Sequence, residues 1–247
     1  MKSAFQVVLY DRSPEVAALA EVLSVGEPEY EVVYKDNRHS FVASAISGER
    51  RLFVKVPRGR DRRTGERVMT LFHGGETIRY AQSMQTLHEL GFVTPRPLAY
   101  GLRKRLGVVV ESFLIYEGLD GRVASNDDAP NVARVINRLH DHGYVRRDAI
   151  RRNFLITDKG VGLIDFRLSK PRLFKAYKFG LEQDQVVSSF PAIGALLTKD
   201  YRDSLIYKIG SWGRRRRKEV SRIRRSKYFK FALSLIVIYL IAGDLAD

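Results

Sequence analysis

The sequence predicts a two-lobed α+β fold, in which a small antiparallel sheet lobe precedes a mainly helical lobe. In the first half of the chain, short apolar segments rich in β-branched residues alternate with turn residues and a few helical segments. Beyond Lys170 the pattern is mostly helical, and the change of character lies near residues 117–125. We therefore expect an N-terminal lobe over residues 1–118, a C-terminal lobe over 119–212 and a distinct tail over 213–247.

The first elements have clear local signals. A short strand is predicted over Gln6–Tyr10. Ser13, Pro14 and Glu15 then mark the start of a helix, because Ser is a common N-cap, Pro fits the first turn and Glu complements the helix dipole. That helix should end before Gly26. The next three strands are expected over Tyr30–Tyr34, Ser40–Ile46 and Arg51–Val56, with a turn at Ser47–Glu49.

A charged, irregular connector over Gly59–Thr70 leads to a predicted helix over Glu76–Leu90. Two prolines make Val93–Leu98 a fixed extended loop in this interpretation. The last strands of the lobe are predicted over Gly107–Val110 and Ser112–Tyr116. In the second lobe, a helix is expected over Val132–His140, because its apolar residues fall on one face.

The segment from Gly143 to Phe166 carries the most chemistry. Asp148 and Asn153 are spaced D-x-x-x-x-N, and an apolar strand, a turn and a second apolar strand then lead to Asp165. This order is typical of phosphotransferases, in which one carboxylate orients or deprotonates the acceptor hydroxyl. The Asn and the second carboxylate hold Mg²⁺ against the ATP phosphates. The alternative is that Asp148 and Asn153 are ordinary turn residues and that Asp165 caps a strand.

Lys55 lies in the predicted strand LFVKV, where a phosphotransferase places a Lys that contacts ATP phosphates. A solvent-facing strand Lys is the simpler alternative. Glu76, at the start of the following helix, is the best candidate for a partner that holds Lys55. A Glu placed there by the helix dipole is an equally good explanation, and Glu89 is a weaker candidate.

Charge is the unusual feature of the composition. The chain has 43 Lys and Arg against 28 Asp and Glu, a net charge of +15, which implies an anionic partner. Four arginines surround Asp148, namely Arg146, Arg147, Arg151 and Arg152, and they are candidates for binding a phosphate or carboxylate of the acceptor; the alternative is a solvated charge cluster. The absence of cysteine excludes disulfides and thiolate metal sites. His140 is interpreted as a packed residue at a helix end.

Together, VKV with Lys55, LHDHGYVRRDAIRRNFLI and LIDF resemble the lipopolysaccharide core heptose(II) kinase family (RfaY/WaaY type), over roughly Val32 to Asp203. The resemblance implies a protein-kinase-like fold and ATP-dependent phosphorylation of a heptose of the lipopolysaccharide inner core, at the cytoplasmic side of the inner membrane. It also implies that Lys55 binds ATP phosphates, that Asp148 is the catalytic Asp, and that Asn153 and Asp165 bind Mg²⁺.

The sequence departs from the common kinase pattern in three places. Arg146 replaces the His of the catalytic loop, and Arg167 replaces the Gly of D-F-G. The Gly-rich phosphate loop is replaced by Asp36–Ser40, where Asn37, Ser40 and backbone N–H groups are candidates for phosphate contact. Neighbouring alternatives are a kinase for the Kdo sugar or for heptose I. A different class is a non-catalytic, membrane- or RNA-bound scaffold with the same fold.

The tail combines a dense run of Lys and Arg over residues 213–230 with an apolar run over 231–242. The apolar run is shorter than the roughly 20 residues that span a bilayer. We expect attachment to an anionic inner-membrane surface, with burial of the tail in the C-terminal lobe as the alternative. Nucleic acid is not expected, because no aromatic binding platform accompanies the charge. The N-terminus has no signal-peptide pattern, so a cytoplasmic location is predicted.

Overall fold

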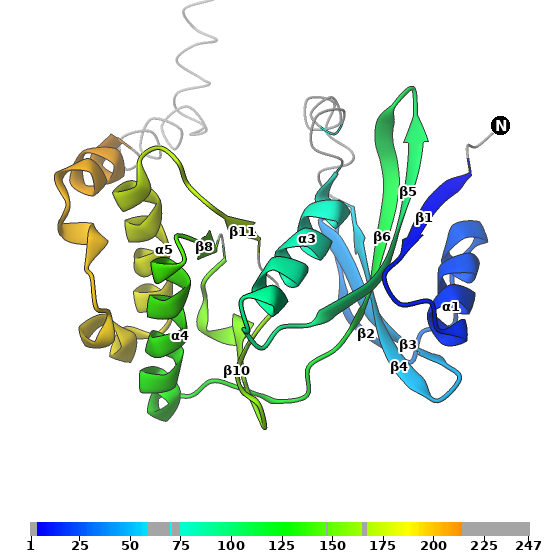
Figure 1. Ribbon diagram of the computed structural model, residues 1–247, viewed down its shortest axis with the longest axis horizontal. Coiled ribbons are helices and arrows are strands. Elements are labelled where there is room, and N and C mark those ends of the chain that lie inside the picture. The colour runs from blue at the N-terminus through cyan, green and yellow to red at the C-terminus, as the bar shows by residue number, and fades with distance from the viewer. Residues whose placement is uncertain (1–3, 59–69, 71–74, 147, 165–166, 214–247) are drawn as a thin grey trace, which may run out of the picture.

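The computed structural model describes residues 4–58, 70, 75–146, 148–164 and 167–213. These residues form the predicted pair of lobes, an N-terminal lobe built on a sheet and a C-terminal lobe built mainly of helices (Figure 1). The predicted fold class is therefore confirmed. The predicted boundary at residues 118–119 falls in the connection between the last strand of the large sheet and the first strand of the C-terminal lobe.

The N-terminal lobe contains a six-stranded antiparallel sheet in the order β1-β5-β6-β4-β3-β2. The strands are β1 (Phe5–Leu9), β2 (Val32–Asp36), β3 (Ser40–Ser47), β4 (Arg50–Pro57), β5 (Arg96–Arg105) and β6 (Val108–Glu117). Side chains alternate between the two faces along β4, and Leu52 and Val54 are fully buried on the same face, so the strand presents an apolar row to one side of the sheet.

Two helices cover opposite faces of this sheet (Figure 1). Helix α1 (Pro14–Val25) packs Val16, Leu19 and other apolar side chains against the strands on one face. Helix α3 (Glu76–Glu89) packs Tyr80, Ala81 and Met84 against Leu114 of β6 on the other face. Both helices match the predicted positions. Because β-strand side chains alternate between faces, one strand can pack side chains against both helices.

Ser13 occupies the N-cap position of α1 as predicted, but its side chain does not cap the helix. Its hydroxyl instead accepts a hydrogen bond from Nη1 of Arg50 at 2.9 Å. That guanidinium also pairs with Asp11 at 3.2 Å. Tertiary contact with β4 has therefore replaced the local cap.

The loop predicted over Val93–Leu98 is wrong in its second half, because β5 already begins at Arg96. Pro97 lies beyond the last β1 pair, Leu9 with Ala99, and beside a register shift against β6. A proline is tolerated at such an irregular position because its missing N–H is not needed by the ladder. The two short strands predicted after Gly107 are one continuous strand, β6, which pairs with β5 along its length.

The C-terminal lobe combines short strands with two longer helices. Its elements are β7 (Arg122–Val123), α4 (Ala129–Asp141), β8 (Val145–Arg146), β9 (Phe154–Thr157), β10 (Gly160–Leu163), β11 (Leu168–Ser169) and α5 (Lys175–Ser189), followed by 3₁₀ turns at Pro191–Leu196 and Tyr201–Asp203. Residues 205–213 are also helical. The core of this lobe joins α4, α5 and the β9–β10 hairpin, with Phe154, Ile136 and Val186 fully or almost fully buried.

Backbone contacts join the two lobes beside the predicted site. The N–H of Leu163 in β10 donates to the carbonyl oxygen of Val93 at 2.9 Å, and Val93 bridges Gly162. The hydroxyl of Thr94 donates to the carbonyl oxygen of Leu163 at 3.3 Å. Leu87 and Phe92, at the end of α3, belong to the core of the C-terminal lobe. The strand that leads to Asp165 is therefore fixed to the segment that follows α3.

Candidate active site

Lys55 is a buried cation. It lies on the face of β4 opposite to Leu52 and Val54, beneath α3, and only 7 % of the residue is exposed. Its Nζ lies 3.9 Å from the ring centroid of Tyr80 on α3, which is a cation–π distance. The solvent-facing alternative for Lys55 is therefore wrong. A buried ammonium group requires negative charge or aromatic faces around it, which favours a functional position.

Asp148 and Asn153 lie on one short loop between α4 and β9, as the sequence predicted. Asn153 is buried, and its Nδ2 donates to the backbone carbonyl of Asp148 at 2.9 Å. The loop is also held by Ala149, which is fully buried between these residues. The hydrogen bond occupies the amide nitrogen of Asn153, so its amide oxygen is the atom that a cation would contact.

The loop of Asp148 is connected directly to the strand that precedes Asp165. Ile164, the last described residue before Asp165, donates its N–H to the carbonyl oxygen of Asn153 at 3.1 Å. Asp165 itself lies outside the described residues, so its predicted role as a metal ligand stays a prediction. The hydrogen bond between Ile164 and Asn153 joins the residue before Asp165 to the loop of Asp148.

A buried carboxylate that was not predicted from the sequence, Glu182, contacts Arg146 at the start of this loop. Glu182 on α5 accepts the backbone N–H of Arg146 at 3.0 Å through Oε2. The same oxygen lies 3.1 Å from Nε2 of His140, and Oε1 lies 3.6 Å from Nε of Arg146. Burial lowers the pKa of Arg146 to about 10, although the charges of Glu182 and Asp148 act to raise it. His140 is buried, which confirms its interpretation as a packed residue at a helix end.

Glu182 had a detectable sequence signal. It lies three residues after Phe179 and four before Val186, and all three are buried on the same face of α5. A carboxylate within an apolar helical stripe needs a polar partner inside the protein. That rule indicates a buried ion pair at Glu182, although it does not identify Arg146 as the partner.

Glu76 contacts a different cation from the one that the sequence suggested. Its carboxylate pairs with the guanidinium of Arg167, the residue that replaces the Gly of D-F-G. Arg167 also lies over Tyr80, 5.5 Å from the ring centroid. Tyr80 therefore contacts both Arg167 and Lys55. A pair between Glu76 and Lys55 stays a prediction, and Glu89 ends α3, far along the helix from Glu76.

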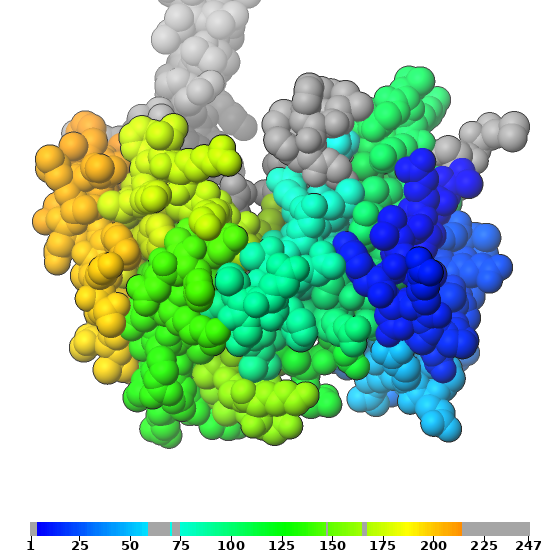
Figure 2. All heavy atoms as spheres, viewed as in Figure 1, coloured from blue at the N-terminus to red at the C-terminus, as the bar shows by residue number. Residues whose placement is uncertain are grey.

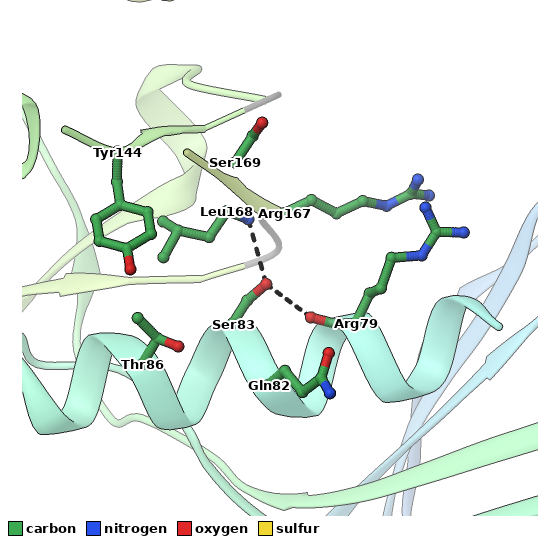
Figure 3. A pocket seen from close by; sticks show the side chains of 8 residues that line it. All are labelled: Arg79, Gln82, Ser83, Thr86, Tyr144, Arg167, Leu168 and Ser169. Carbon is green, nitrogen blue, oxygen red and sulfur yellow. Dashed lines mark hydrogen bonds between the residues drawn. The ribbon is translucent and has the colours of Figure 1, made fainter. Parts of the chain in front are cut away.

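A cavity of about 350 Å³ lies between α3 and the segment that enters β11 (Figure 3). Its lining is mostly polar and comprises Arg79, Gln82, Ser83, Thr86, Tyr144, Arg167, Leu168 and Ser169. Figure 3 shows the guanidinium groups of Arg79 and Arg167 at the same end of this cavity. The hydroxyl of Ser83 accepts the N–H of Leu168 at 3.2 Å, which holds the cavity's two walls together.

The arginines that the sequence put forward for acceptor binding have different positions. Arg151 and Arg152 are exposed on the 3₁₀ turn before β9, and the N–H of Arg151 donates to the hydroxyl of Ser189 at 3.0 Å. Arg147 lies outside the described residues. Their role toward an acceptor stays a prediction. Arg79 and Arg167 are further basic groups, which line the cavity beside α3 and which sequence spacing alone did not connect.

The turn between β2 and β3 takes the place of the Gly-rich phosphate loop of common kinases. Oδ1 of Asn37 accepts the N–H groups of His39 at 2.9 Å and Ser40 at 3.1 Å. The turn is thus closed by its own side chain, as an Asx-type turn is. The proposed phosphate contacts of Asn37 and Ser40 stay predictions, and they would require this turn to exchange those hydrogen bonds for ligand oxygens.

The donor set fits Mg²⁺ better than a transition metal. In the described part of the chain, no group of three or more His, Cys, Asp or Glu side chains is arranged to hold a metal ion. A kinase-type site needs only an amide oxygen, one carboxylate and phosphate oxygens, because Mg²⁺ keeps several waters and shares its ligands with the nucleotide. Asn153 is the described residue that meets this requirement.

Comparison with known proteins finds one matching family model, over the central part of the chain. Residues 68–184, a little under half of the chain, match the model of the lipopolysaccharide kinase (Kdo/WaaP) family. That stretch contains Asp148, Asn153, Asp165 and the two glutamates of the site, whereas Lys55 precedes it. No curated protein sequence matches the chain.

A solved structure, WaaP in complex with acyl carrier protein, resembles the fold with a TM-score of 0.50 and 18 % sequence identity. The similarity covers 87 % of this chain and 98 % of that chain. At this identity the likeness concerns the fold. The central part of the sequence, from residue 68 to residue 184, is thus similar to the lipopolysaccharide kinase (Kdo/WaaP) family.

Proposed function

We propose that the protein transfers the γ-phosphoryl group of ATP to a hydroxyl of a heptose in the lipopolysaccharide core. The family similarity of residues 68–184 supports the class of reaction. The observation that carries the proposal is the hydrogen bond from Nδ2 of Asn153 to the carbonyl oxygen of Asp148, 2.9 Å long. It holds the proposed base and the proposed metal ligand on one short loop, in which Ala149 and Asn153 are buried.

Each proposed role follows from the chemistry of the side chain. Asp148 would orient the acceptor hydroxyl and take its proton, and Lys55 would contact the ATP phosphates with its buried ammonium group. The amide oxygen of Asn153 and the carboxylate of Asp165 would hold Mg²⁺, which neutralises phosphate charge when bound. Glu76 would act through Arg167 and Tyr80, which lie beside Lys55.

The acceptor is proposed to be anionic. Arg147, Arg151 and Arg152 flank Asp148 in the sequence, and Arg79 and Arg167 line the nearby cavity. Guanidinium groups suit phosphate and carboxylate oxygens because they donate several hydrogen bonds in a fixed plane. Lipopolysaccharide core sugars carry such groups. We place the reaction in the cytoplasm at the anionic surface of the inner membrane, with the tail over residues 213–247 contributing basic charge.

A second acceptor is favoured by a specific observation. The description of the matching family model names Kdo as well as WaaP. A hydroxyl of the sugar Kdo is therefore the alternative acceptor. Both sugars present secondary hydroxyls that a carboxylate base can orient. The residues that hold ATP would be the same, and only the acceptor contacts would differ.

The decisive experiment is transfer of labelled phosphate from Mg-ATP to purified lipopolysaccharide whose core has been enzymatically dephosphorylated. We expect label on a core heptose, and Asp165→Ala should lose it. Asp148→Asn should reduce transfer by about 10²–10⁴-fold while ATP still binds, because a general base contributes that range. Full activity of Asp148→Asn would remove Asp148 from this role. Label on Kdo would select the second acceptor, and absence of ATP binding would favour a non-catalytic scaffold.

A further inference from the structure

The C-terminal lobe exposes a group of large apolar side chains at one end. They come from the loop before α5 and from the helix over residues 205–213, which lie at the same end of the lobe (Figure 1). We call them the apolar–basic face, and its apolar members are Leu173, Phe174, Leu205, Ile206, Ile209 and Trp212. Each of the six is at least half exposed, whereas soluble proteins rarely gather such residues without a binding partner.

The loop before α5 presents its apolar residues openly. Leu173 is 76 % exposed and Phe174 is 68 % exposed. Phe174 also has a left-handed backbone conformation, with φ of 53°, which is costly for a bulky side chain. The neighbouring Pro171 is buried and anchors the loop. The phenyl ring of Phe174 is therefore held outward by the fold at an energetic cost, which is typical of residues that contact a partner.

The helix over residues 205–213 packs against α5 through one face. Tyr207 and Ser211 are buried, and Tyr207 donates to Asp184 of α5. Close packing with α5 is required at Gly210, because a Cβ atom there would lie 2.5 Å from the ring of Tyr177. Leu205, Ile209 and Trp212, spaced i, i+4 and i+7, form the opposite stripe and are exposed.

Basic residues surround the exposed apolar side chains. A hollow of about 530 Å³ at the foot of the loop is lined by Gly143, Lys170, Pro171, Arg172 and Lys175. Lys178 and Lys208 are also exposed at this end. Asp203 lies 3.9 Å from Lys208, so one acidic group offsets part of this charge. After Gly213, the sequence continues as RRRRK.

From these observations we infer that the apolar–basic face inserts into an anionic bilayer surface. Leu173, Phe174 and Trp212 enter the boundary between headgroups and acyl chains, and Lys170, Arg172 and Lys175 contact lipid phosphates. Apolar side chains ringed by Lys and Arg, with a Trp among them, are the composition of interfacial membrane surfaces. The inference rests on the proposed site of action at a lipid surface, and it assigns the inserted apolar part of that contact to the folded lobe, in addition to the basic charge of the tail.

The test uses the full chain and its single tryptophan, Trp212. Vesicles of phosphatidylcholine, with and without phosphatidylglycerol, are added while Trp emission and acrylamide quenching are followed, and binding is measured by co-sedimentation. We expect a blue shift and reduced quenching with the anionic vesicles. The variant Leu173→Ser/Phe174→Ser should bind about 10- to 100-fold more weakly, since each apolar group contributes through its burial.

A matched control removes exposed apolar side chains elsewhere. Val25→Ser/Ile46→Ser, at positions exposed on the N-terminal lobe, should bind vesicles like the unaltered protein. Circular dichroism and phosphate transfer to detergent-dispersed acceptor report whether each variant is folded, independently of vesicle binding. Failure of transfer by the unaltered protein would contradict the proposed function and leave the vesicle result intact.

Three outcomes would contradict the inference. Unchanged vesicle binding of Leu173→Ser/Phe174→Ser would assign attachment to the tail alone. Trp212 emission that is already blue-shifted without lipid and does not respond to vesicles would mean that the tail or a second copy covers the face; gel filtration distinguishes these two occupants. Arg172→Gln/Lys175→Gln should lose the preference for phosphatidylglycerol, and an unchanged preference would contradict the role given to the basic residues.

Discussion

Two arginine–glutamate pairs near the candidate site differ in depth and in the parts that they join. Arg146 and Glu182 have side chains that are 0 % and 1 % exposed, and both belong to the C-terminal lobe. Arg167 and Glu76 are 17 % and 11 % exposed, and they connect the entry to β11 with α3 of the other lobe. The first pair fixes the loop of Asp148 inside one lobe. The second fixes α3, and with it Tyr80 above Lys55, against the other lobe.

This difference predicts different consequences of breaking each pair. Charges that are fully removed from water depend on their partners, because an uncompensated buried charge is strongly unfavourable. A pair that retains access to water loses less, since solvent can replace part of the interaction. The buried pair should therefore dominate stability, and the inter-lobe pair should act mainly on the geometry of the nucleotide site.

The largest effect is expected for Glu182→Gln. The substitution removes the charge that faces Arg146 and His140, and we expect the free energy of unfolding to fall by about 3–5 kcal/mol. Urea denaturation followed by circular dichroism measures it. Glu111→Gln is the control, because Glu111 is 53 % exposed in its pair with Arg103, and it should change stability by less than about 1 kcal/mol. A similar loss in both variants would contradict the distinction by burial.

A double replacement makes this prediction sharper. Arg146→Met combined with Glu182→Leu removes both charges and should recover much of the stability lost by Glu182→Gln, because apolar packing can replace a buried pair. If the buried pair also positions Asp148, phosphate transfer should stay low in the refolded double variant. Recovery of both stability and transfer would limit the pair to a structural role.

A smaller effect is expected at the inter-lobe pair. Glu76→Gln should lower the free energy of unfolding by about 1.5–3 kcal/mol, in the range for hydrogen bonds to charged groups. Double-mutant cycles of Glu76→Gln with Arg167→Gln and with Lys55→Met then identify the partner. We expect a coupling energy of about 0.5–3 kcal/mol with Arg167, as for residues in contact. A coupling energy that is larger with Lys55 than with Arg167 would instead support the Glu76–Lys55 pair that the sequence suggested.

The smallest effect is expected at a third pair, Arg122 with Asp128, where the arginine is 59 % exposed. Hydrogen bonds from Arg122 and then from the backbone and side chain of Ser125 hold the pKa of Asp128 well below its usual range. Its stabilising contribution is therefore complete above the unfolded pKa near 3.9 and is lost as the pH falls below it.

Asp128 forms a capping box with Ser125 at the 3₁₀ turn Asn126–Asp128, just before α4. Asp128→Asn should accordingly lower Tm by about 2–4 °C at neutral pH, the scale of a lost cap in a chain of this size. The difference from the unaltered protein should shrink as the pH falls toward 2. Thermal melts at several pH values measure both. A difference that stays constant down to low pH would show that the charge of Asp128 is not the source of the effect.

Much of the local structure could be predicted from sequence because it follows from short-range patterns. The helices α1, α3 and α4 and the strands β3 and β4 lie close to their predicted bounds, since apolar periodicity and terminal residues define them. The start of β5 could not be predicted in the same way. Pro95 and Pro97 argue locally for a loop, and only pairing with β6 makes Arg96 and Pro97 part of a strand.

The candidate site also combines features that the sequence predicts with features that only the tertiary structure decides. The sequence by itself determined which side chains are candidates and in which order they follow one another. Lys55 is recognised by its place in an apolar strand, and Asp148, Asn153 and Asp165 by their close spacing in one segment. The tertiary structure decided the partners. Glu76 and Arg167 are 91 residues apart and Arg146 and Glu182 are 36 apart, so their pairing depends on how the lobes and helices pack. A sequence pattern specifies which groups are available, whereas burial determines which of them must neutralise one another.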